Sequence, residues 1–272
     1  MCEDVHKEKL NKSVYPCSQV GVVMPLVLLP GWSFDRRIWQ DLIESLQRVI
    51  PVITLNLPGF GDNRWASWSG VEDLCEKILQ TMPPRAIYMG WSLGGMLATK
   101  IAVTFPERVA GIITLATNIS FVERNHWPHG MAISDFRNFH KGIAKAPEQT
   151  LKRFHLLISQ GDQLHRQQFR WLQTVAAKTE DYEHLLPMLS LLADIDNRED
   201  IHKLSIPGLH IFGESDRLVP ASVIQKLSGL ATYHNHNQQQ LHLLKSTGHL
   251  VFWPGDRIIP LVEAFLTEHY GH

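Results

Sequence analysis

The sequence predicts an α/β fold with a mostly parallel central sheet, helices on both faces and an inserted helical lid. Short apolar, β-branched runs alternate with segments whose apolar residues recur every three or four positions. This alternation stops at Asn118 and resumes near Asp200. The chain of 272 residues is long enough for one large core and short for several. We therefore expect one α/β domain with an insertion.

Six runs are expected to be strands, because each is short, apolar and rich in branched side chains. They are Leu26–Leu29, Val52–Leu55, Ala86–Met89, Val109–Leu115, Gly208–Phe212 and Leu241–Leu244. Three segments between the early strands have the apolar spacing of helices, namely Ile38–Val49, Val71–Met82 and Leu93–Thr104. Parallel strands need such crossovers, and the crossover helices cover the sheet.

Residues 118–200 carry no strong strand signal. Four parts of this segment read as helices, namely Phe136–Ala146, Glu148–Ser159, Gln163–Ala177 and Glu183–Leu192. A bare loop of this length is rare in a compact domain. We predict a helical lid at 118–200, a core made of residues 25–117 and 201–272, and a polar N-terminal extension at 1–24 that precedes the first strand.

The composition excludes several classes of protein. With 26 basic and 27 acidic side chains, the chain has no global positive field, which argues against a dedicated nucleic-acid binder. No apolar stretch approaches the roughly 20 residues that cross a bilayer, and the N-terminus lacks the apolar core of a secretory signal. We expect a cytoplasmic protein without a membrane span. The cysteines, Cys2, Cys17 and Cys75, show no paired framework, so reduced thiols without a catalytic role are expected.

The polar stretch from His234 to Gln240 is the one candidate for metal binding. His234 and His236 have no acid or thiol beside them, so a polar loop is the better interpretation. We predict neither a metal nor another cofactor.

A candidate nucleophile lies at the end of the third predicted strand. Gly90-Trp91-Ser92-Leu93-Gly94 matches the G-x-S-x-G pattern, with a strand before it and a helix after it. The glycines permit a tight turn that exposes Ser92 at the helix N-terminus, where backbone N–H groups favour a developing anion. The pattern alone also fits an ordinary glycine-rich turn, but its context favours a nucleophile.

A serine hydroxyl needs a base, and the base needs an orienting acid. In such a fold these partners follow later strands, the acid first. Asp216 follows the fifth predicted strand and His249 follows the sixth. Glu214, two residues before Asp216, is an alternative acid. We predict Ser92, Asp216 and His249 as a catalytic triad.

The oxyanion of an acyl-transfer reaction needs two N–H donors. One is expected from Leu93, the residue after the nucleophile. The other is expected from Trp32, because Gly31 before it permits close backbone approach. A packing role for the Trp32 ring is compatible with this.

Four blocks carry a family resemblance: Leu26–Trp32, Leu57–Gly61, Gly90–Gly95 and Phe105–Val109. They resemble the α/β-hydrolase superfamily and, more closely, the pimeloyl-acyl-carrier-protein methyl ester esterases of biotin synthesis. The resemblance covers about residues 25 to 268. It implies an enzyme that hydrolyses the methyl ester of pimeloyl-acyl-carrier protein, releases methanol and has the acyl-carrier protein as its partner.

The lid supports this resemblance through its charge. Residues 118–178 hold nine basic and four acidic side chains, so this segment is at +5 while the rest of the chain is at −6. A cationic face suits an acidic carrier protein. The resemblance implies that Arg153, Arg166 and Arg170 grip the carrier, although a solvated helix surface is the plainer alternative. Gln149 stands where the family has a fourth arginine.

Aromatic residues are candidates for an apolar acyl channel. They are Trp32, Trp91, Phe136, Phe139 and Phe154, and of these we expect Trp32 and Phe154 to contact the substrate. Ordinary core packing is the alternative for each. Pro30 stands where relatives usually have His, which leaves room for a different acyl substrate.

Two rival functions remain open. The first is another enzyme on the same scaffold, either a broad short-chain carboxylesterase or a carbon–carbon bond hydrolase, because the triad sets the mechanism and the pocket sets the substrate. The second is a catalytically silent ligand-binding protein, against which the intact triad argues. We expect a monomer.

Overall fold

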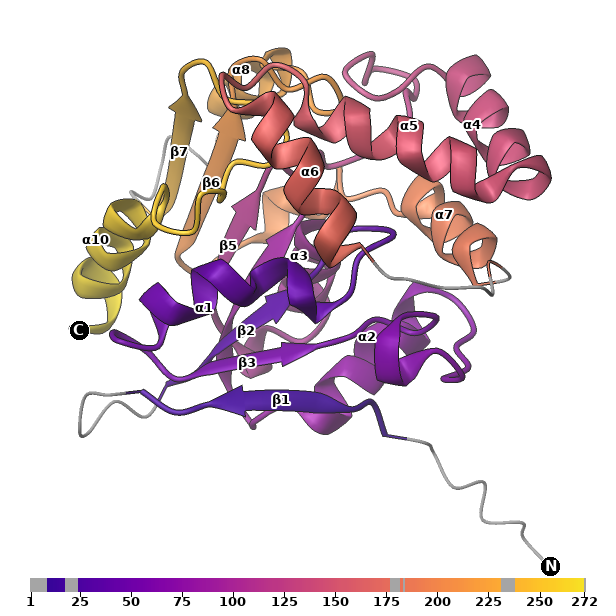
Figure 1. Cartoon of the computed structure of the whole chain (residues 1–272). Coiled ribbons are helices and arrows are strands. Elements are labelled where there is room, and N and C mark those ends of the chain that lie inside the picture. The colour runs from indigo at the N-terminus through magenta and orange to yellow at the C-terminus, as the bar shows by residue number, and fades with distance from the viewer. Residues whose placement is uncertain (1–8, 18–23, 177–181, 183, 231–237, 272) are drawn as a thin grey trace, which may run out of the picture.

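The computed structural model describes residues 9–17, 24–176, 182, 184–230 and 238–271. Their strands form one seven-stranded sheet in the order β1-β3-β2-β4-β5-β6-β7 (Figure 1). The strands are β1 Lys12–Tyr15, β2 Leu26–Leu29, β3 Val52–Leu55, β4 Ala86–Trp91, β5 Val109–Leu115, β6 Gly208–Gly213 and β7 Gln239–Leu244. Every neighbouring pair is parallel except β1 and β3. The predicted α/β class with a mostly parallel sheet is confirmed.

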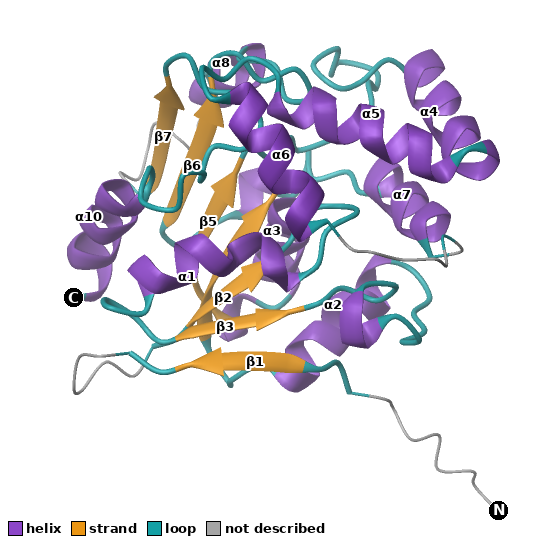
Figure 2. Cartoon of the chain, viewed as in Figure 1, coloured by secondary structure: helices purple, strands orange, loops and turns teal. Residues whose placement is uncertain are grey.

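Helices cover both faces of the sheet. In Figures 1 and 2, α1 lies in front of the sheet and α3 lies behind it. The core helices are α1 Gln40–Leu46, α2 Val71–Thr81, α3 Leu93–Thr104, α8 Ser222–Ser228 and α10 Ile259–Tyr270. Short 3-10 helices are η1 Arg36–Trp39, η2 Gly61–Asn63, η3 Pro106–Arg108 and η4 Ile201–Lys203. Covering both faces explains why every residue of β2 to β6 is buried.

The N-terminal region differs from the prediction. We expected a polar extension before the first strand, but Lys12–Tyr15 is itself a strand that pairs antiparallel with Val52–Leu55. Asn63 fixes its start, since its side chain donates to Asn11 O at 3.1 Å and accepts from Asn11 N at 2.7 Å. The expectation that Leu26–Leu29 is the first strand is therefore wrong. The predicted extension's residues 1–8 and 18–23 lie outside the described residues.

Among the described residues of the predicted lid, four helices lie over the carboxyl ends of the strands (Figure 1). They are α4 Ile133–Lys145, α5 Pro147–Ser159, α6 His165–Val175 and α7 Leu185–Asp194. Each overlaps one predicted helix, with shifted ends. The segment predicted as one helix at Ile38–Val49 is instead divided into η1 and α1, and Asp35 caps the start of η1 by accepting from Arg37 N at 2.9 Å.

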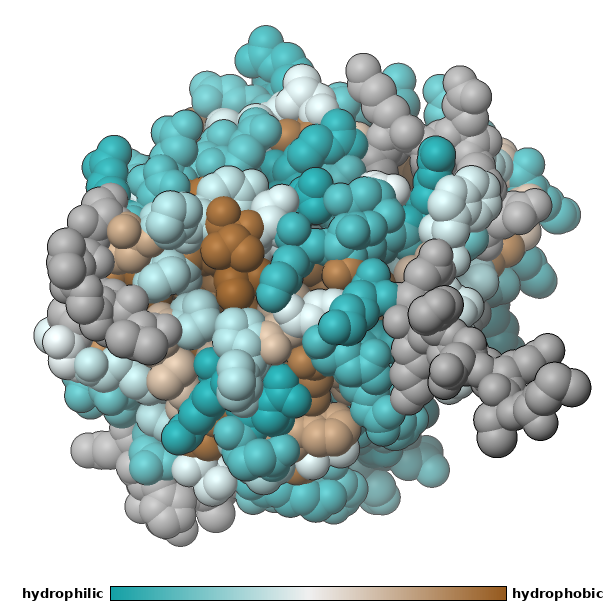
Figure 3. Space-filling model, turned by 90° about the horizontal axis from the view of Figure 1, so that it is seen from below, coloured by the Kyte–Doolittle hydropathy of each residue, from teal (hydrophilic) through white to brown (hydrophobic). Residues whose placement is uncertain are grey.

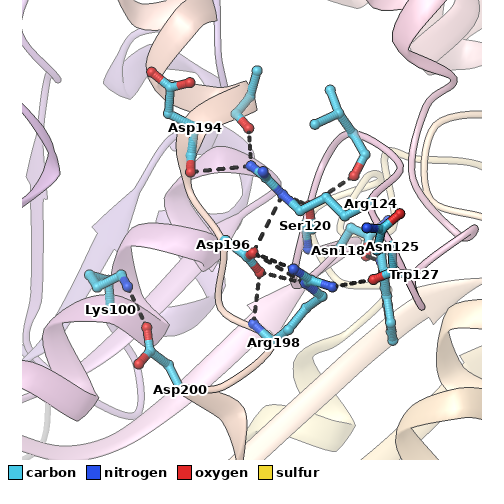
Figure 4. Close-up of polar contacts among 12 residues, drawn as sticks. Lys100, Asn118, Ser120, Arg124, Asn125, Trp127, Asp194, Asp196, Arg198 and Asp200 are labelled. Carbon is cyan, nitrogen blue, oxygen red and sulfur yellow. Dashed lines mark hydrogen bonds and ion pairs between the residues drawn. The ribbon is translucent and has the colours of Figure 1, made fainter.

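The two stems of the lid are joined to each other (Figure 4). Ser120 and Asp196 form an isolated antiparallel bridge. The Asp196 carboxylate pairs with Arg198 at 2.8 Å and with Arg124 at 3.5 Å. The second stem is also tied to α3, through an ion pair between Asp200 and Lys100. Arg124, one of the basic residues of the lid segment, is thus used to hold the lid in place.

The turn between α5 and α6 rests on the core. A Cβ on Gly161 would lie 2.0 Å from Ser215 O, and Gly161 has a φ of 86°. Both facts favour glycine at this position. Next to it, the buried Asp162 accepts from Arg257 at 2.5 Å. The lid therefore contacts the core at its tip as well as at its stems.

The surface seen from below carries hydrophobic side chains in small separate patches among hydrophilic ones (Figure 3). Large apolar side chains that are exposed include Val14 in β1 and Trp65 after η2. In the described part of the chain, no helix has the length and apolar character that a bilayer crossing requires.

Candidate active site

The Gly90–Gly94 segment forms a tight turn between β4 and α3. Ser92 has a φ of 53° and a ψ of −114°. A Cβ on Gly90 would lie 2.2 Å from the backbone of Gly94, and a Cβ on Gly94 would lie 2.0 Å from Leu29 O. Larger side chains cannot fit at either position, so the sequence pattern and the unusual backbone of Ser92 belong together.

Asp216 and His249 meet in the loops that follow β6 and β7. His249 Nδ1 lies 2.8 Å from Asp216 Oδ2, and both side chains are buried. The other carboxylate oxygen, Oδ1, accepts from Leu218 N at 2.8 Å and from Val219 N at 3.0 Å. Because the Asp216 carboxylate accepts a hydrogen bond from Nδ1–H, the proton of the neutral ring is on Nδ1 and the lone pair is on Nε2. A general base needs this arrangement.

Glu214, the alternative acid, faces elsewhere. Its Oε2 accepts from Ser246 N at 3.0 Å, in the loop that leads to His249. The structure therefore brings Asp216, and not Glu214, to the imidazole.

Trp91 joins the His249 loop to the Ser92 turn. The Trp91 indole Nε1 donates to His249 O at 3.0 Å, and the two rings lie 5.4 Å apart. Trp91 is the last residue of β4 and directly precedes Ser92, so this contact ties the His249 loop to the segment that carries the candidate nucleophile. Trp91 is buried against Phe34 and Phe252, so its role is packing within the core.

The loop of residues 30–33 lies beside this turn, and we call it the oxyanion loop. A Cβ on Gly31 would lie 2.8 Å from the Trp91 ring, so the loop approaches β4 closely. Within the part of the chain that the structure describes, the N–H groups of Trp32 and Leu93 have no hydrogen-bond partner. These two N–H groups are therefore free to donate, and their role as oxyanion donors stays a prediction.

The Trp32 side chain is held by the lid. Its Nε1 donates to Leu185 O at 3.1 Å, and its ring lies 5.4 Å from Phe139 and 5.1 Å from Phe154. The rings of Phe139 and Phe154 also stack on each other at 5.2 Å. These three aromatic residues form an apolar cluster between the oxyanion loop and the lid. Phe136 lies apart from it, against Phe121 and His140.

The predicted carrier-binding arginines are exposed on α5 and α6. Arg153 is on α5, while Arg166 and Arg170 lie one turn apart on α6. No ion pair involves any of the three among the described residues. Arg166 and Arg170 line a surface hollow of about 450 Å³ together with Leu156, His165 and Phe169.

The sequence did not single out a polar contact behind the oxyanion loop. His155 of α5 is buried and reaches Ser33, which has a positive φ of 72°. A histidine and a serine far apart in the chain carry no motif, so only their tertiary contact reveals them.

The other candidates were a metal site and a reactive cysteine. Among the described residues, no group of three or more His, Cys, Asp or Glu side chains could hold a metal ion. His234 and His236 lie outside the described residues, as does Cys2. Burial raises the pKa of the Cys75 thiol to about 12, so Cys75 is not an activated nucleophile.

Comparison with known proteins identifies the family. Residues 26–260 match the sequence pattern of the alpha/beta hydrolase family. The chain belongs to this family. The matched residues include strands β2 to β7 and helices α4 to α7.

Two curated relatives of this alpha/beta hydrolase are biotin biosynthesis bifunctional proteins BioHC. The protein of Cellvibrio japonicus is 36% identical over 228 residues, which are 84% of this chain and 44% of that protein. The protein of Teredinibacter turnerae is 37% identical over 223 residues, which are 77% of this chain and 39% of that protein. The chain thus spans less than half the length of these relatives.

Solved structures share the alpha/beta hydrolase fold. The enol-lactonase from Burkholderia xenovorans LB400 has a TM-score of 0.79 at 17% identity and covers 95% of this chain and 96% of that chain. The bromoperoxidase from Bacillus anthracis has a TM-score of 0.77 at 20% identity, with 94% of each chain covered. At such identities the likeness shows the fold alone.

Proposed function

We propose that this chain is a serine carboxylesterase that hydrolyses the methyl ester of pimeloyl-acyl-carrier protein to pimeloyl-acyl-carrier protein and methanol. The observation that carries the hydrolase part is the buried pair of Asp216 and His249, bonded to the residue that precedes Ser92. The relatives named for biotin biosynthesis support the pathway. The substrate itself comes from the resemblance of the sequence motifs to the esterases of that pathway.

In the first half of the proposed reaction, Ser92 Oγ attacks the ester carbonyl while His249 Nε2 takes its proton. Asp216 stabilises the imidazolium that forms. The negative charge moves to the carbonyl oxygen, where the N–H groups of Trp32 and Leu93 receive it. The bond from the carbonyl carbon to the methoxy oxygen then breaks, and His249 returns the proton so that methanol leaves.

In the second half, water hydrolyses the acyl-enzyme. His249 accepts a proton from the water as its oxygen attacks the acyl carbonyl, and the same two N–H groups hold the second oxyanion. The bond to Ser92 Oγ breaks, and His249 protonates Ser92. The carboxylic acid that leaves remains attached to the carrier.

The cationic lid supports a carrier-bound substrate. Arg153, Arg166 and Arg170 have no ion-pair partner among the described residues, so their charge is available to an acidic protein. The hollow beside Arg166 has apolar and cationic walls, which suit the phosphate and the alkyl arm that a carrier presents. Trp32 and Phe154 are the apolar contacts proposed for the acyl chain.

The test compares hydrolysis of pimeloyl-acyl-carrier-protein methyl ester with that of a short-chain chromogenic ester. We expect efficient cleavage of the carrier-bound ester, and Ser92→Ala removes it. Arg166→Ala and Arg170→Ala should each lower kcat/KM for the carrier-bound ester by roughly five- to ten-fold at low salt, without changing turnover of the simple ester.

Lys145→Ala is the matched control, because it removes an exposed cation from α4 of the same lid. It should leave both activities near those of the wild type. Cleavage of the simple ester alone would leave the hydrolase proposal standing and contradict the carrier-bound substrate. Absence of both activities, with no labelling of Ser92 by a serine-directed phosphonate, would favour a catalytically silent protein.

A further inference from the structure

His155 links two lid helices to the oxyanion loop. On one side, His155 Nε2 lies 3.5 Å from Ser33 Oγ. On the other, His155 Nδ1 lies 3.1 Å from Gln173 Nε2 of α6. Ser33 directly follows Trp32, the proposed second oxyanion donor. A chain of polar contacts therefore runs from α6, through α5, to the residue beside that donor.

The bonding partners determine which nitrogen of His155 carries the proton. An amide nitrogen such as Gln173 Nε2 can only donate, so His155 Nδ1 must accept. In the neutral ring the proton is then on Nε2, which points to Ser33 Oγ. His155 is thus a donor toward the oxyanion loop.

The surroundings of His155 keep the ring neutral and fixed. It is 5% exposed and packs against Phe34, with ring centroids 5.0 Å apart. Burial lowers the pKa of His155 to about 4, so the imidazole carries no charge near neutral pH.

Ser33 needs such support because its backbone is unusual. Its φ of 72° lies in the left-handed region, which residues other than glycine adopt only when neighbouring contacts hold them there. A change of this φ would turn the peptide plane that precedes Ser33 and, with it, shift the backbone of Trp32. The separation of 3.5 Å is long for a hydrogen bond, and such contacts in unliganded sites often tighten in the substrate complex.

We propose that His155 is a positioning residue for the oxyanion hole, holding Ser33 so that the Trp32 N–H keeps its direction. This inference rests on the proposed function, because it requires the Trp32 N–H to receive the oxyanion. It does not depend on the carrier, so a simple chromogenic ester is sufficient to test it.

The experiment measures kcat and KM for His155→Leu, Ser33→Ala, the double variant and His155→Gln. The leucine side chain keeps about the volume of the imidazole and lacks its N–H donor. The glutamine amide can place a donor near the position of His155 Nε2. We expect His155→Leu and Ser33→Ala each to lower kcat about ten-fold with KM unchanged, less than the roughly hundred-fold cost of losing a whole oxyanion donor. The double variant should be no slower than the slower single variant, because both act through one contact.

Rescue and a second readout separate positioning from simple destabilisation. His155→Gln should recover kcat to within about three-fold of the wild type, and a trifluoromethyl ketone, which forms a tetrahedral adduct, should bind about ten-fold more weakly to His155→Leu. His140 offers the matched control, since it is another lid histidine near a serine, with Nε2 3.4 Å from Ser190 Oγ. His140→Leu and Ser190→Ala should keep the wild-type kcat.

Three results would overturn the inference while the wild type remains an active esterase. They are an unchanged kcat in His155→Leu, a double variant whose loss is the product of the two single losses, and no rescue by glutamine. A wild type that neither cleaves the ester nor binds the ketone would contradict the proposed function and remove this inference with it.

Discussion

At the scale of single residues, the two oxygens of Asp216 have different partners. Oδ1 is fixed by the N–H groups of Leu218 and Val219, and Oδ2 faces His249. Because backbone donors hold one side of the carboxylate, its other side has a fixed direction toward the imidazole. The acid is therefore positioned by its own loop before any substrate arrives.

This arrangement predicts a large effect for Asp216→Asn. The backbone donors would retain the amide oxygen, so the amide nitrogen would face His249 Nδ1 and force the proton onto Nε2. Such a ring cannot accept the Ser92 proton, and we expect kcat for a chromogenic ester to fall by about 10⁴-fold. Steady-state kinetics checks this, with Glu214→Gln as the neighbouring control. A larger loss in Glu214→Gln than in Asp216→Asn would show that the wrong acid has been assigned.

At the scale of elements, the lid depends on its stems. The Asp196 carboxylate receives three hydrogen bonds from Arg198 Nε and Nη2, the shortest at 2.8 Å, and it lies 3.5 Å from Arg124. The hydrogen bonds from Arg198 lower the pKa of Asp196, which shows that the folded state favours the charged carboxylate. One carboxylate thus joins the entry and the exit of the inserted segment (Figure 4).

We predict that Asp196→Asn weakens the attachment of the lid without unfolding the core. The group is about one third exposed, so the free energy of unfolding should fall by only about 1 kcal/mol. Cleavage within residues 118–200 during limited proteolysis should become faster. Glu199→Gln, in the same stem and exposed, is the control. Equal proteolysis of both variants would mean that the ion pairs do not hold the stems.

The elements also show what the sequence could and could not predict. Strands β2 to β6 are buried on both faces, so their apolar runs were visible without a structure. By contrast, β1 is a short edge strand whose residues alternate between exposed and half-buried, and its pairing with β3 depends on the backbone. Ser92, Asp216 and His249 could be predicted because each follows the end of a predicted strand. The contact of His155 with Ser33 could not be predicted, because it forms only when the lid packs on the core.

At the scale of the whole molecule, two buried histidines make stability depend on pH. His210 lies inside the sheet between Thr114 Oγ1 at 2.7 Å and Gln239 Oε1 at 2.9 Å. Burial lowers its pKa to about 4, as it does for His155. Both pKa values are lower in the folded state than the usual 6.5, so acid favours the unfolded chain, which binds protons first.

The expected outcome is full stability above pH 6.5 and a progressive loss as the pH falls toward 4. Each histidine contributes on the order of 3 kcal/mol to this loss at the acid end. Urea unfolding at several pH values measures it. His155→Leu should flatten the curve, while His202→Asn, at an exposed position, should leave it unchanged. A curve that is the same for His155→Leu and the wild type would contradict this account.

The attachment of the lid tip has a consequence for substrate choice. Gly161 rests on Ser215, and Asp162 is paired with Arg257, while both stems and Trp32 provide further points of attachment. A lid that is attached to the core at so many places is a fixed cover and not a mobile one. Discrimination between esters would then depend on the cross-section of the substrate that enters beneath this fixed lid. A linear acyl chain on a long arm would be a better substrate than a compact, branched ester.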